Sequence, residues 1–300
     1  MMPDSKLANC LDKGDFIVTA EYLPRASLNG DILKTLSNSS VHAVNVADNP
    51  YGIAMSSIAG SVALSRSGVE PIYQLVTRDR NRIALGSDLL GAASLGIKNV
   101  LCLSGYHQTL MGCPESANVY DIDSIQLISA VTRMSNDKVL PDGRKFEGDF
   151  AMLAGAVANP CLKPIELNII RLVKKVEAGA RFIQTQAVFD VQVFAEWLEA
   201  TQAEGIADKT AILAGVLPLS DVEEAGKLRD TYTNYQIPDE IINRLKVAGD
   251  REAQRKEGLA ISLEIIKEVE KMTGLRGIHI LSGGKEAIVP ELLSASGLGK

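Results

Sequence analysis

The sequence predicts a single α/β domain over residues 1–300, folded as a (β/α)8 TIM barrel. Three observations support this prediction. A length of 300 residues suits one barrel of this kind. β-rich runs alternate with helical stretches, which is typical of parallel sheets built from strand–helix units. The first strand is followed by "LPRASLNG" and not by a GxGxxG turn, which disfavours the alternative, an open doubly wound sheet.

Eight apolar, β-rich runs predict the strands of the barrel. They are residues 16–22, 41–47, 70–76, 99–104, 149–157, 180–186, 211–217 and 277–281. Apolar residues recur at helical spacing in the intervening segments, most clearly over 164–178, 190–204 and 254–273. In a barrel of this class the functional groups gather where the strands end and the following loops begin. We therefore expect the polar residues at the strand ends to lie together.

Composition and charge exclude several classes of protein. The net charge is −6 and the pI is near 5.3, so the chain lacks the basic face that nucleic-acid binding needs. No apolar run reaches the roughly 18 residues of a membrane span. The polar N-terminus has no signal-peptide pattern, which predicts a cytoplasmic protein. Neither the four cysteines nor the three histidines have metal-ligand spacing, so no metal site is predicted.

A carboxylate ends the first strand, in "TAEYLPR". Glu21 is costly in an otherwise apolar strand unless it is solvated, paired or functional. Its alternatives are a rim salt bridge, for example with Arg25, and a part in chemistry. In the sixth strand, alternation directs Gln184 and Gln186 to the same face, where buried amides need partners. Gln186 lies nearer the rim and suits hydrogen bonding to a heterocycle.

Basic and turn-forming residues follow other strands. A local basic cluster follows the third strand, and its members are Arg78, Arg80 and Arg82. The cluster either meets a phosphate or carboxylate ligand or begins a solvated helix. Asp48 and Asn49, in "ADNPYG", are explained as turn residues before a proline. These groups suit an organic ligand better than metal-driven hydrolysis, and a redox reaction here would need a bound electron carrier.

Five motifs, in a fixed order, resemble those of methylenetetrahydrofolate reductases, the flavin-dependent barrel enzymes of one-carbon metabolism. They are "TAEYLPR", "EPIYQLVTRDRNRIALGSDLLGAASLGIKNVLCLSG", "KKVEAGARFIQTQAVFD", "AGVLPLS" and "GIHIL". The resemblance covers residues 14 to 297. The "RDRNRIAL…DLLGA" block is similar to the branch found in anaerobes, including acetogens, which links the chain to the Wood–Ljungdahl pathway.

The resemblance implies a reaction and a set of site residues. Reduced flavin, FAD rather than FMN, would pass hydride from N5 to 5,10-methylenetetrahydrofolate and give 5-methyltetrahydrofolate, in a reaction that could run in either direction. Glu21 matches the family's catalytic acid, which needs a raised pKa from partial burial. Gln186 and Phe189 match positions at the folate. Flavin contacts are implied for Gln74, Gly105, Tyr106, His107, Asn159 and Lys175.

Tyr106 departs from the family's pattern. Relatives usually read Leu-x-Gly-Asp after the fourth strand, whereas this chain reads Leu103-Ser104-Gly105-Tyr106. An anion beside the flavin disfavours its anionic reduced form, so its loss is expected to raise the potential of the bound flavin. The same loss could instead remove an electrostatic aid to the folate iminium and slow reduction. His107 is expected to be a loop or ribityl contact and not a catalytic residue.

The resemblance also implies partners. Besides methylenetetrahydrofolate, an electron donor is needed, either NAD(P)H or a partner electron-transfer subunit such as a small zinc- or iron–sulfur-containing protein. The chain itself has no cysteine motif for an iron–sulfur cluster. An oligomer or a heteromeric complex is expected. Two alternatives remain: a flavin-free folate-binding or corrinoid-linked methyltransferase barrel, and a non-catalytic subunit of a reductase complex.

Overall fold

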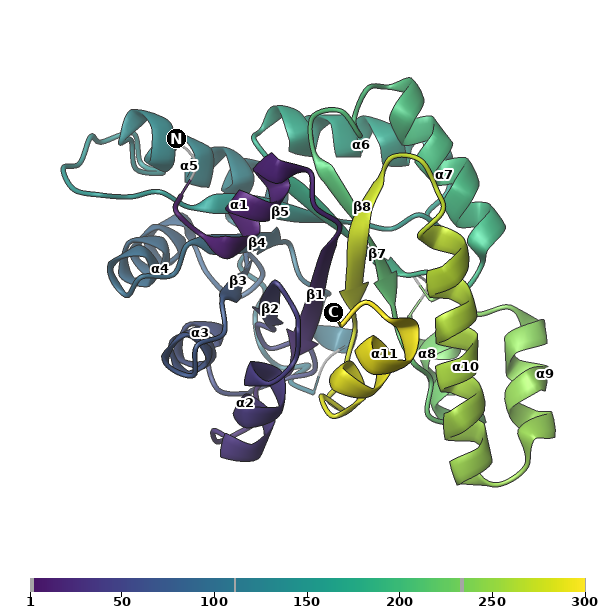
Figure 1. Cartoon of the computed structure of the whole chain (residues 1–300). Helices are drawn as coiled ribbons and strands as arrows, with labels where there is room; N and C mark the ends of the chain where they lie inside the picture. Colours follow the sequence, from purple (N-terminus) through teal and green to yellow (C-terminus); the bar gives the residue numbers. More distant parts are fainter. Residues whose placement is uncertain (1–2, 111, 233–234, 300) are drawn as a thin grey trace.

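A computed structural model of the chain describes residues 3–110, 112–232 and 235–299, so the outermost ends of the predicted domain, residues 1–2 and 300, lie outside it. Eight parallel strands close into a barrel in sequence order (Figure 1). They are β1 (Ile17–Tyr22), β2 (Ala43–Val46), β3 (Pro71–Val76), β4 (Asn99–Leu103), β5 (Leu153–Ala158), β6 (Phe182–Ala187), β7 (Ala211–Val216) and β8 (Leu275–Ile280). The predicted (β/α)8 TIM barrel is confirmed.

Helices alternate with the strands and surround the barrel (Figure 1). They are α1 (Lys6–Lys13), α2 (Gly30–Ser37), α3 (Ser57–Arg66), α4 (Arg82–Ser94), α5 (Ser124–Asp137), α6 (Ile165–Glu177), α7 (Val191–Ala203), α8 (Val222–Thr231), α9 (Asp239–Ala248), α10 (Arg251–Val269) and α11 (Ile288–Ser296), with a short 3-10 turn η1 (Gln108–Leu110). The helices predicted over 164–178, 190–204 and 254–273 are α6, α7 and α10. Within the described residues, no helix is long and apolar enough to cross a membrane.

The largest difference from the predicted strands is at the start of β5. The apolar run over 149–157 predicts a strand from its first residue, but β5 begins at Leu153, where its pairing with Asn99 of β4 begins. Phe150 and Met152 are buried all the same, because they pack into the hydrophobic core before the chain enters the sheet. Burial without strand pairing leaves the same apolar signal in the sequence.

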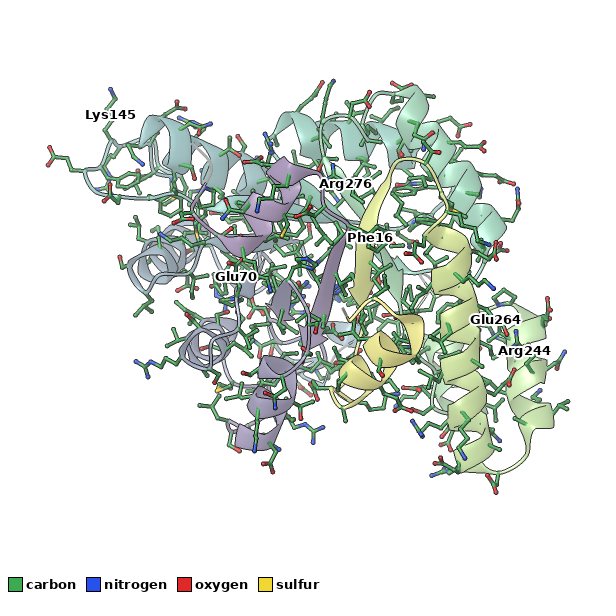
Figure 2. All side chains as sticks on the ribbon, in the orientation of Figure 1. Phe16, Glu70, Lys145, Arg244, Glu264 and Arg276 are labelled. Carbon is green, nitrogen blue, oxygen red and sulfur yellow. The ribbon has the colours of Figure 1, made fainter. Side chains whose placement is uncertain are left out.

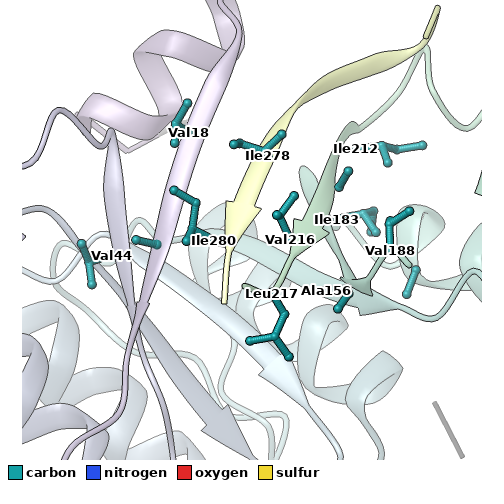
Figure 3. Packing of buried hydrophobic residues seen from close by; sticks show 14 of the residues in the cluster. Val18, Val44, Ala156, Ile183, Val188, Ile212, Val216, Leu217, Ile278 and Ile280 are labelled. Atoms are coloured by element: carbon teal, nitrogen blue, oxygen red, sulfur yellow. The ribbon is translucent and has the colours of Figure 1, made fainter. Parts of the chain in front are cut away.

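The main hydrophobic core lies between the barrel and its helices. Outward-facing side chains of neighbouring strands pack there side by side, as Figure 3 shows for Val18, Val44, Ile183, Val216 and Ile278. Strands of a parallel barrel are buried on both faces, which explains why most of the predicted strands are nearly continuous apolar runs.

The interior of the barrel has a second, smaller apolar cluster at the amino ends of the strands. Leu7 of α1 closes this end and packs in the same cluster as Ile17, Phe182 and Leu213. Gly155 makes room for the Phe182 ring, because a Cβ there would lie 2.1 Å from that ring. Glu70, labelled in Figure 2, accepts hydrogen bonds from the first main-chain N–H groups of α1 and fixes this helix on the barrel.

The connection between β7 and β8 is longer than the others and carries α8, α9 and α10. Arg244 on α9 binds Glu257 and Glu264 on α10, with Nη1 of Arg244 2.6 Å from Oε2 of Glu264 (Figure 2). These ion pairs fasten α9 to α10. The segment between α8 and α9 carries Tyr232 and Tyr235 to the carboxyl ends of the strands, where they line cavities.

Candidate active site

The carboxyl ends of the strands surround a cavity of 380 Å³. Six of the residues that the sequence predicts for the site line it, namely Glu21, Gln74, Gly105, Tyr106, Asn159 and Gln186. They come from β1, β3, β6 and the loops after β4 and β5. The structure therefore brings together side chains that are separated by up to 165 positions, as strand ends of one barrel must be (186 minus 21).

Three predicted residues, Phe189, His107 and Lys175, lie outside the lining of this cavity. Phe189 is 6% exposed and packs in the hydrophobic core around the barrel. His107 is exposed, and its Nδ1 lies 2.9 Å from the hydroxyl oxygen of Thr109 in the same loop. Their roles at the folate and at the flavin stay predictions.

Lys175 lies in a groove of 330 Å³ that adjoins the cavity and shares Asn159 with it. Its ammonium group donates a hydrogen bond to the carbonyl oxygen of Val157 at 2.6 Å. Burial, together with the positive charge of Arg171, lowers the pKa of Lys175 to about 8. Lys163 also lines the groove, so three cationic groups face one cleft, which suits an anionic ligand.

Glu21 stands where the 380 Å³ cavity meets a second cavity of 670 Å³. Burial raises the pKa of the Glu21 carboxyl to about 7, although the main-chain N–H of Gly283 donates a hydrogen bond to its Oε2 at 3.3 Å and favours the anion. Arg25 instead donates to the carbonyl oxygen of Gly284 at 2.9 Å, and no salt bridge joins it to Glu21 within the described residues. A carboxyl group that titrates near neutrality can act as a general acid.

A hydrogen-bonded polar layer forms the floor of the cavity. Gln184 Nε2 donates to Asn45 Oδ1 and to Thr19 Oγ1, both at 3.0 Å, so the predicted need of Gln184 for partners is met. His279 Nδ1 lies 2.9 Å from Thr19 Oγ1. Burial lowers the pKa of His279 to about 3, which keeps its ring neutral. Asn45 and His279 are polar residues on buried strands, a signal that could have placed them in the site.

Arg78 connects three loops around the cavity. Its side chain is buried and binds the Asp79 carboxylate at 2.7 Å. It also donates to the carbonyl oxygens of Asn49, at 3.1 Å, and Tyr106, at 3.3 Å. Gly105 has a φ of +84°, and a Cβ there would lie 3.2 Å from Cβ of Arg78. A glycine is therefore required where the β4 loop passes the arginine.

The other two arginines of the basic cluster are also paired. Arg80 binds Asp48 at 2.6 Å and Asp88 at 2.9 Å, and Arg82 binds Asp121 at 2.8 Å. The explanation of Asp48 as a turn residue is incomplete, because its carboxylate is buried and also accepts a hydrogen bond from Val76 N–H at 3.0 Å. The cluster therefore braces the loops of the rim through its own carboxylates.

Four tyrosines gather at the mouth of the two cavities, and the sequence predicted only one of them. They are Tyr51, Tyr106, Tyr232 and Tyr235. The ring centroids of Tyr106 and Tyr232 are 5.4 Å apart, and those of Tyr232 and Tyr235 are 6.0 Å apart. Three of these residues lie in loops without periodicity, so no sequence pattern marked them. Their ring faces suit a flat aromatic ligand.

The chain is similar to known proteins. The methylenetetrahydrofolate reductase family matches residues 6–297. The 5,10-methylenetetrahydrofolate reductase of Salmonella typhimurium is 25% identical over 215 residues, which cover 71% of this chain and 66% of that protein. Methylenetetrahydrofolate reductase (NADH) 1 of Zea mays is 24% identical over 304 residues, 94% of this chain and 49% of the relative. The match thus spans less than two thirds of either relative.

A solved structure has a similar fold. It is an uncharacterized protein from Clostridium thermocellum that binds two copies of 5-methyl-5,6,7,8-tetrahydrofolic acid. It superposes with a TM-score of 0.68 over 98% of this chain and 100% of that chain, at 12% identity. At this identity the likeness shows the fold alone.

Proposed function

Because the chain belongs to the methylenetetrahydrofolate reductase family, we propose that it reduces 5,10-methylenetetrahydrofolate to 5-methyltetrahydrofolate with a bound flavin and with Glu21 as general acid. One observation carries the proposal: the carboxyl group of Glu21, with a pKa raised to about 7, stands at the junction of two cavities at the carboxyl end of the barrel. An acid of this strength can protonate a ligand nitrogen at neutral pH.

The residues present fit a flavin. Polar side chains of Gln74 and Asn159 line the 380 Å³ cavity, which suits the edge of a heterocycle. The adjoining groove carries Lys163, Arg171 and Lys175, three cationic groups for phosphate oxygens. Three cations favour a flavin with two phosphates, which supports FAD over FMN. When bound there, the flavin would supply the hydride.

The protein's own groups would prepare the folate. Glu21 would donate a proton to the folate nitrogen, so that the five-membered ring opens to an iminium. Gln186, which faces the same cavity, would hydrogen-bond the pterin. By resemblance, Phe189 would pack near the substrate and His107 would contact the flavin. The four tyrosines would exclude water from the junction and offer flat apolar surfaces.

Membership of the family supports a folate as the substrate, and a protein of the same fold provides an example of a barrel that binds one. The Clostridium thermocellum protein with the same fold binds 5-methyl-5,6,7,8-tetrahydrofolic acid. The Salmonella typhimurium relative is a 5,10-methylenetetrahydrofolate reductase. For the electron donor we propose either NAD(P)H or an electron-transfer partner subunit, in an oligomer or heteromeric complex.

The experiment begins with the purified chain, incubated with FAD or FMN and freed of excess flavin. We expect a yellow protein whose reduced flavin is reoxidised when 5,10-methylenetetrahydrofolate is added without oxygen, with 5-methyltetrahydrofolate detected by chromatography. The Glu21→Gln variant should bind flavin equally and reoxidise it at least about 100-fold more slowly. A chain that stays colourless with both flavins yet binds folate would refute the proposal and favour a flavin-free methyltransferase barrel. Flavin binding without reoxidation would favour a non-catalytic subunit.

A further inference from the structure

A second carboxyl group lies beside Glu21, in the loop of residues 281–287 that joins β8 to α11. Gly283 N–H in this loop donates a hydrogen bond to Glu21 Oε2 at 3.3 Å. In the opposite direction, Leu23 N–H, two residues after Glu21, donates to Oε1 of Glu286 at 3.0 Å. The loop and the end of β1 therefore hold each other through a reciprocal pair of side-chain to main-chain hydrogen bonds.

The Glu286 carboxylate is enclosed and, among the described residues, lacks a basic partner. Only 2% of the residue is exposed. The ammonium group of its neighbour Lys285 is bound to Glu224 at 2.6 Å and to the Ser220 hydroxyl at 2.6 Å. Arg25, which crosses the same loop, donates to a main-chain carbonyl. Within the described part of the chain, no basic side chain lies within ion-pair distance of Glu286.

We propose that Glu286 is a positioning residue for Glu21: its enclosed carboxylate anchors the loop that supplies Gly283 N–H, and it brings a second negative charge beside Glu21 that favours the acid form. A negative charge in a poorly solvated place disfavours the ionisation of a neighbouring carboxyl group. The role in catalysis rests on the proposed function of Glu21 as proton donor. The electrostatic coupling of the two carboxyl groups does not depend on that function.

Several other titratable groups around Glu21 are either neutral or paired with a basic side chain. Burial raises the pKa of the Tyr51 and Tyr235 hydroxyls far above neutrality, so both rings are uncharged at neutral pH. His279 on β8 is neutral because its pKa is about 3. Around the 670 Å³ cavity, the loop before α8 and α8 itself add other charges, Asp221, Glu223, Glu224 and Lys227. Glu224 is paired with Lys285, and Glu223 with Arg251.

The known causes of the raised Glu21 pKa agree with this geometry. Burial is the largest cause, and the negative charge of Glu286 acts in the same direction. The N–H groups of Gly283 and Ser282 act against both, because they stabilise the anion. The loop therefore supplies two opposing influences. Its N–H groups orient the Glu21 carboxyl and stabilise the anion, and the Glu286 charge adds to burial in favouring the acid form.

The test follows the titration of Glu21 directly in the full chain. Glutamate labelled with carbon-13 at its carboxyl carbon is incorporated, and the Glu21 resonance is identified by its loss in Glu21→Gln. Glu286→Gln keeps an oxygen that can accept the Leu23 N–H but removes the charge. We expect the Glu21 midpoint to fall by about one pH unit in this variant. The matched control is Glu291→Gln, which removes one negative charge from the Arg255 pair on α11 and should leave the midpoint unchanged.

The reductase assay gives a second readout. In Glu286→Gln the fall of activity at high pH should begin at a lower pH, shifted by the same interval as the NMR midpoint of Glu21. The loss of a merely structural residue would not cause this shift. A folded Glu286→Gln protein with the wild-type midpoint overturns the proposal. If that variant does not fold, Glu286→Asp is tested in its place. It retains the charge and should keep the raised Glu21 midpoint. An ordinary Glu21 midpoint in Glu286→Asp overturns the proposal as well. A wild-type protein without reductase activity, in which Glu286→Gln still lowers the Glu21 midpoint, would refute the proposed function alone.

Discussion

Replacement of Glu21 by glutamine should remove a loss of stability that the wild type undergoes as pH rises, and the raised pKa sets the size of that loss. The Glu21 carboxyl has a pKa of about 7 in the folded protein, against 4.5 for the free group. Between these values the folded state binds the proton and the unfolded state has released it. The free energy of unfolding of the wild type therefore falls as pH rises through this window, and it is level below and above it. Glutamine does not titrate, so the variant lacks this fall.

The size of the effect follows from the two pKa values. Their difference of 2.5 (7 minus 4.5) corresponds to about 3.4 kcal/mol at about 1.36 kcal/mol per pH unit. At about pH 5 roughly 0.8 kcal/mol of that loss has already occurred, and at about pH 8.5 nearly all of it has. We therefore expect the free energy of unfolding of Glu21→Gln, relative to that of the wild type, to rise by about 2.5 kcal/mol between these two pH values.

The assay is urea unfolding of both proteins at the two pH values, followed by circular dichroism and by tryptophan fluorescence. The difference between variant and wild type removes the titration of all other groups that behave alike in both. Coincident transitions by the two probes are needed, because only then is a free energy of unfolding defined. A difference that changes by less than about 0.5 kcal/mol between the two pH values would refute the raised pKa of Glu21 and with it the proposed acid.

Two further predictions concern the base and the rim of the barrel. Leu7→Ala should lower the free energy of unfolding by about 2–4 kcal/mol, because Leu7 is fully buried against the barrel interior; Leu95→Ala, at a residue 56% exposed, is the control in the same urea titration, and equal losses would contradict this view of α1. Tyr106→Asp should lower the potential of a bound flavin by about 30 mV in an anaerobic dye titration, equivalent to about 1.4 kcal/mol. Tyr106→Phe should not lower it, and an unchanged potential in the aspartate variant would contradict the electrostatic argument.

The barrel was predictable because its signals are local and repeated. Each strand is a short apolar run and each helix has a regular spacing, so an error of a few residues, as at β5, leaves the architecture intact. Glu21 and Gln186 were predictable for a related reason. A polar side chain near the end of an apolar strand must face the rim, since the strand places its end there.

The remaining parts of the site depend on loop conformation, which sequence spacing does not encode. Asp48 stands beside Asn49 and Pro50, and these turn residues explain it fully until Arg80 is brought against it from the next loop. Tyr51 and Tyr235 lie 184 positions apart (235 minus 51) and have no pattern of their own, yet they line the same two cavities. Glu286 carries no signal because its partner is a main-chain N–H, which every residue except proline has.

The distribution of polar groups along the barrel axis explains how the fold tolerates the destabilising groups of the site. The amino end is closed by α1 over an apolar cluster around Leu7 and Phe182. Above it, the layer of Gln184 and His279 is polar but neutral, so its hydrogen bonds are satisfied without a buried charge. The enclosed carboxyl groups of Glu21, Asp48 and Glu286 lie at the rim instead. A charge that destabilises the fold is tolerable there because the stabilising contacts lie at the opposite end and around the outside, and mutations in the two regions should act independently.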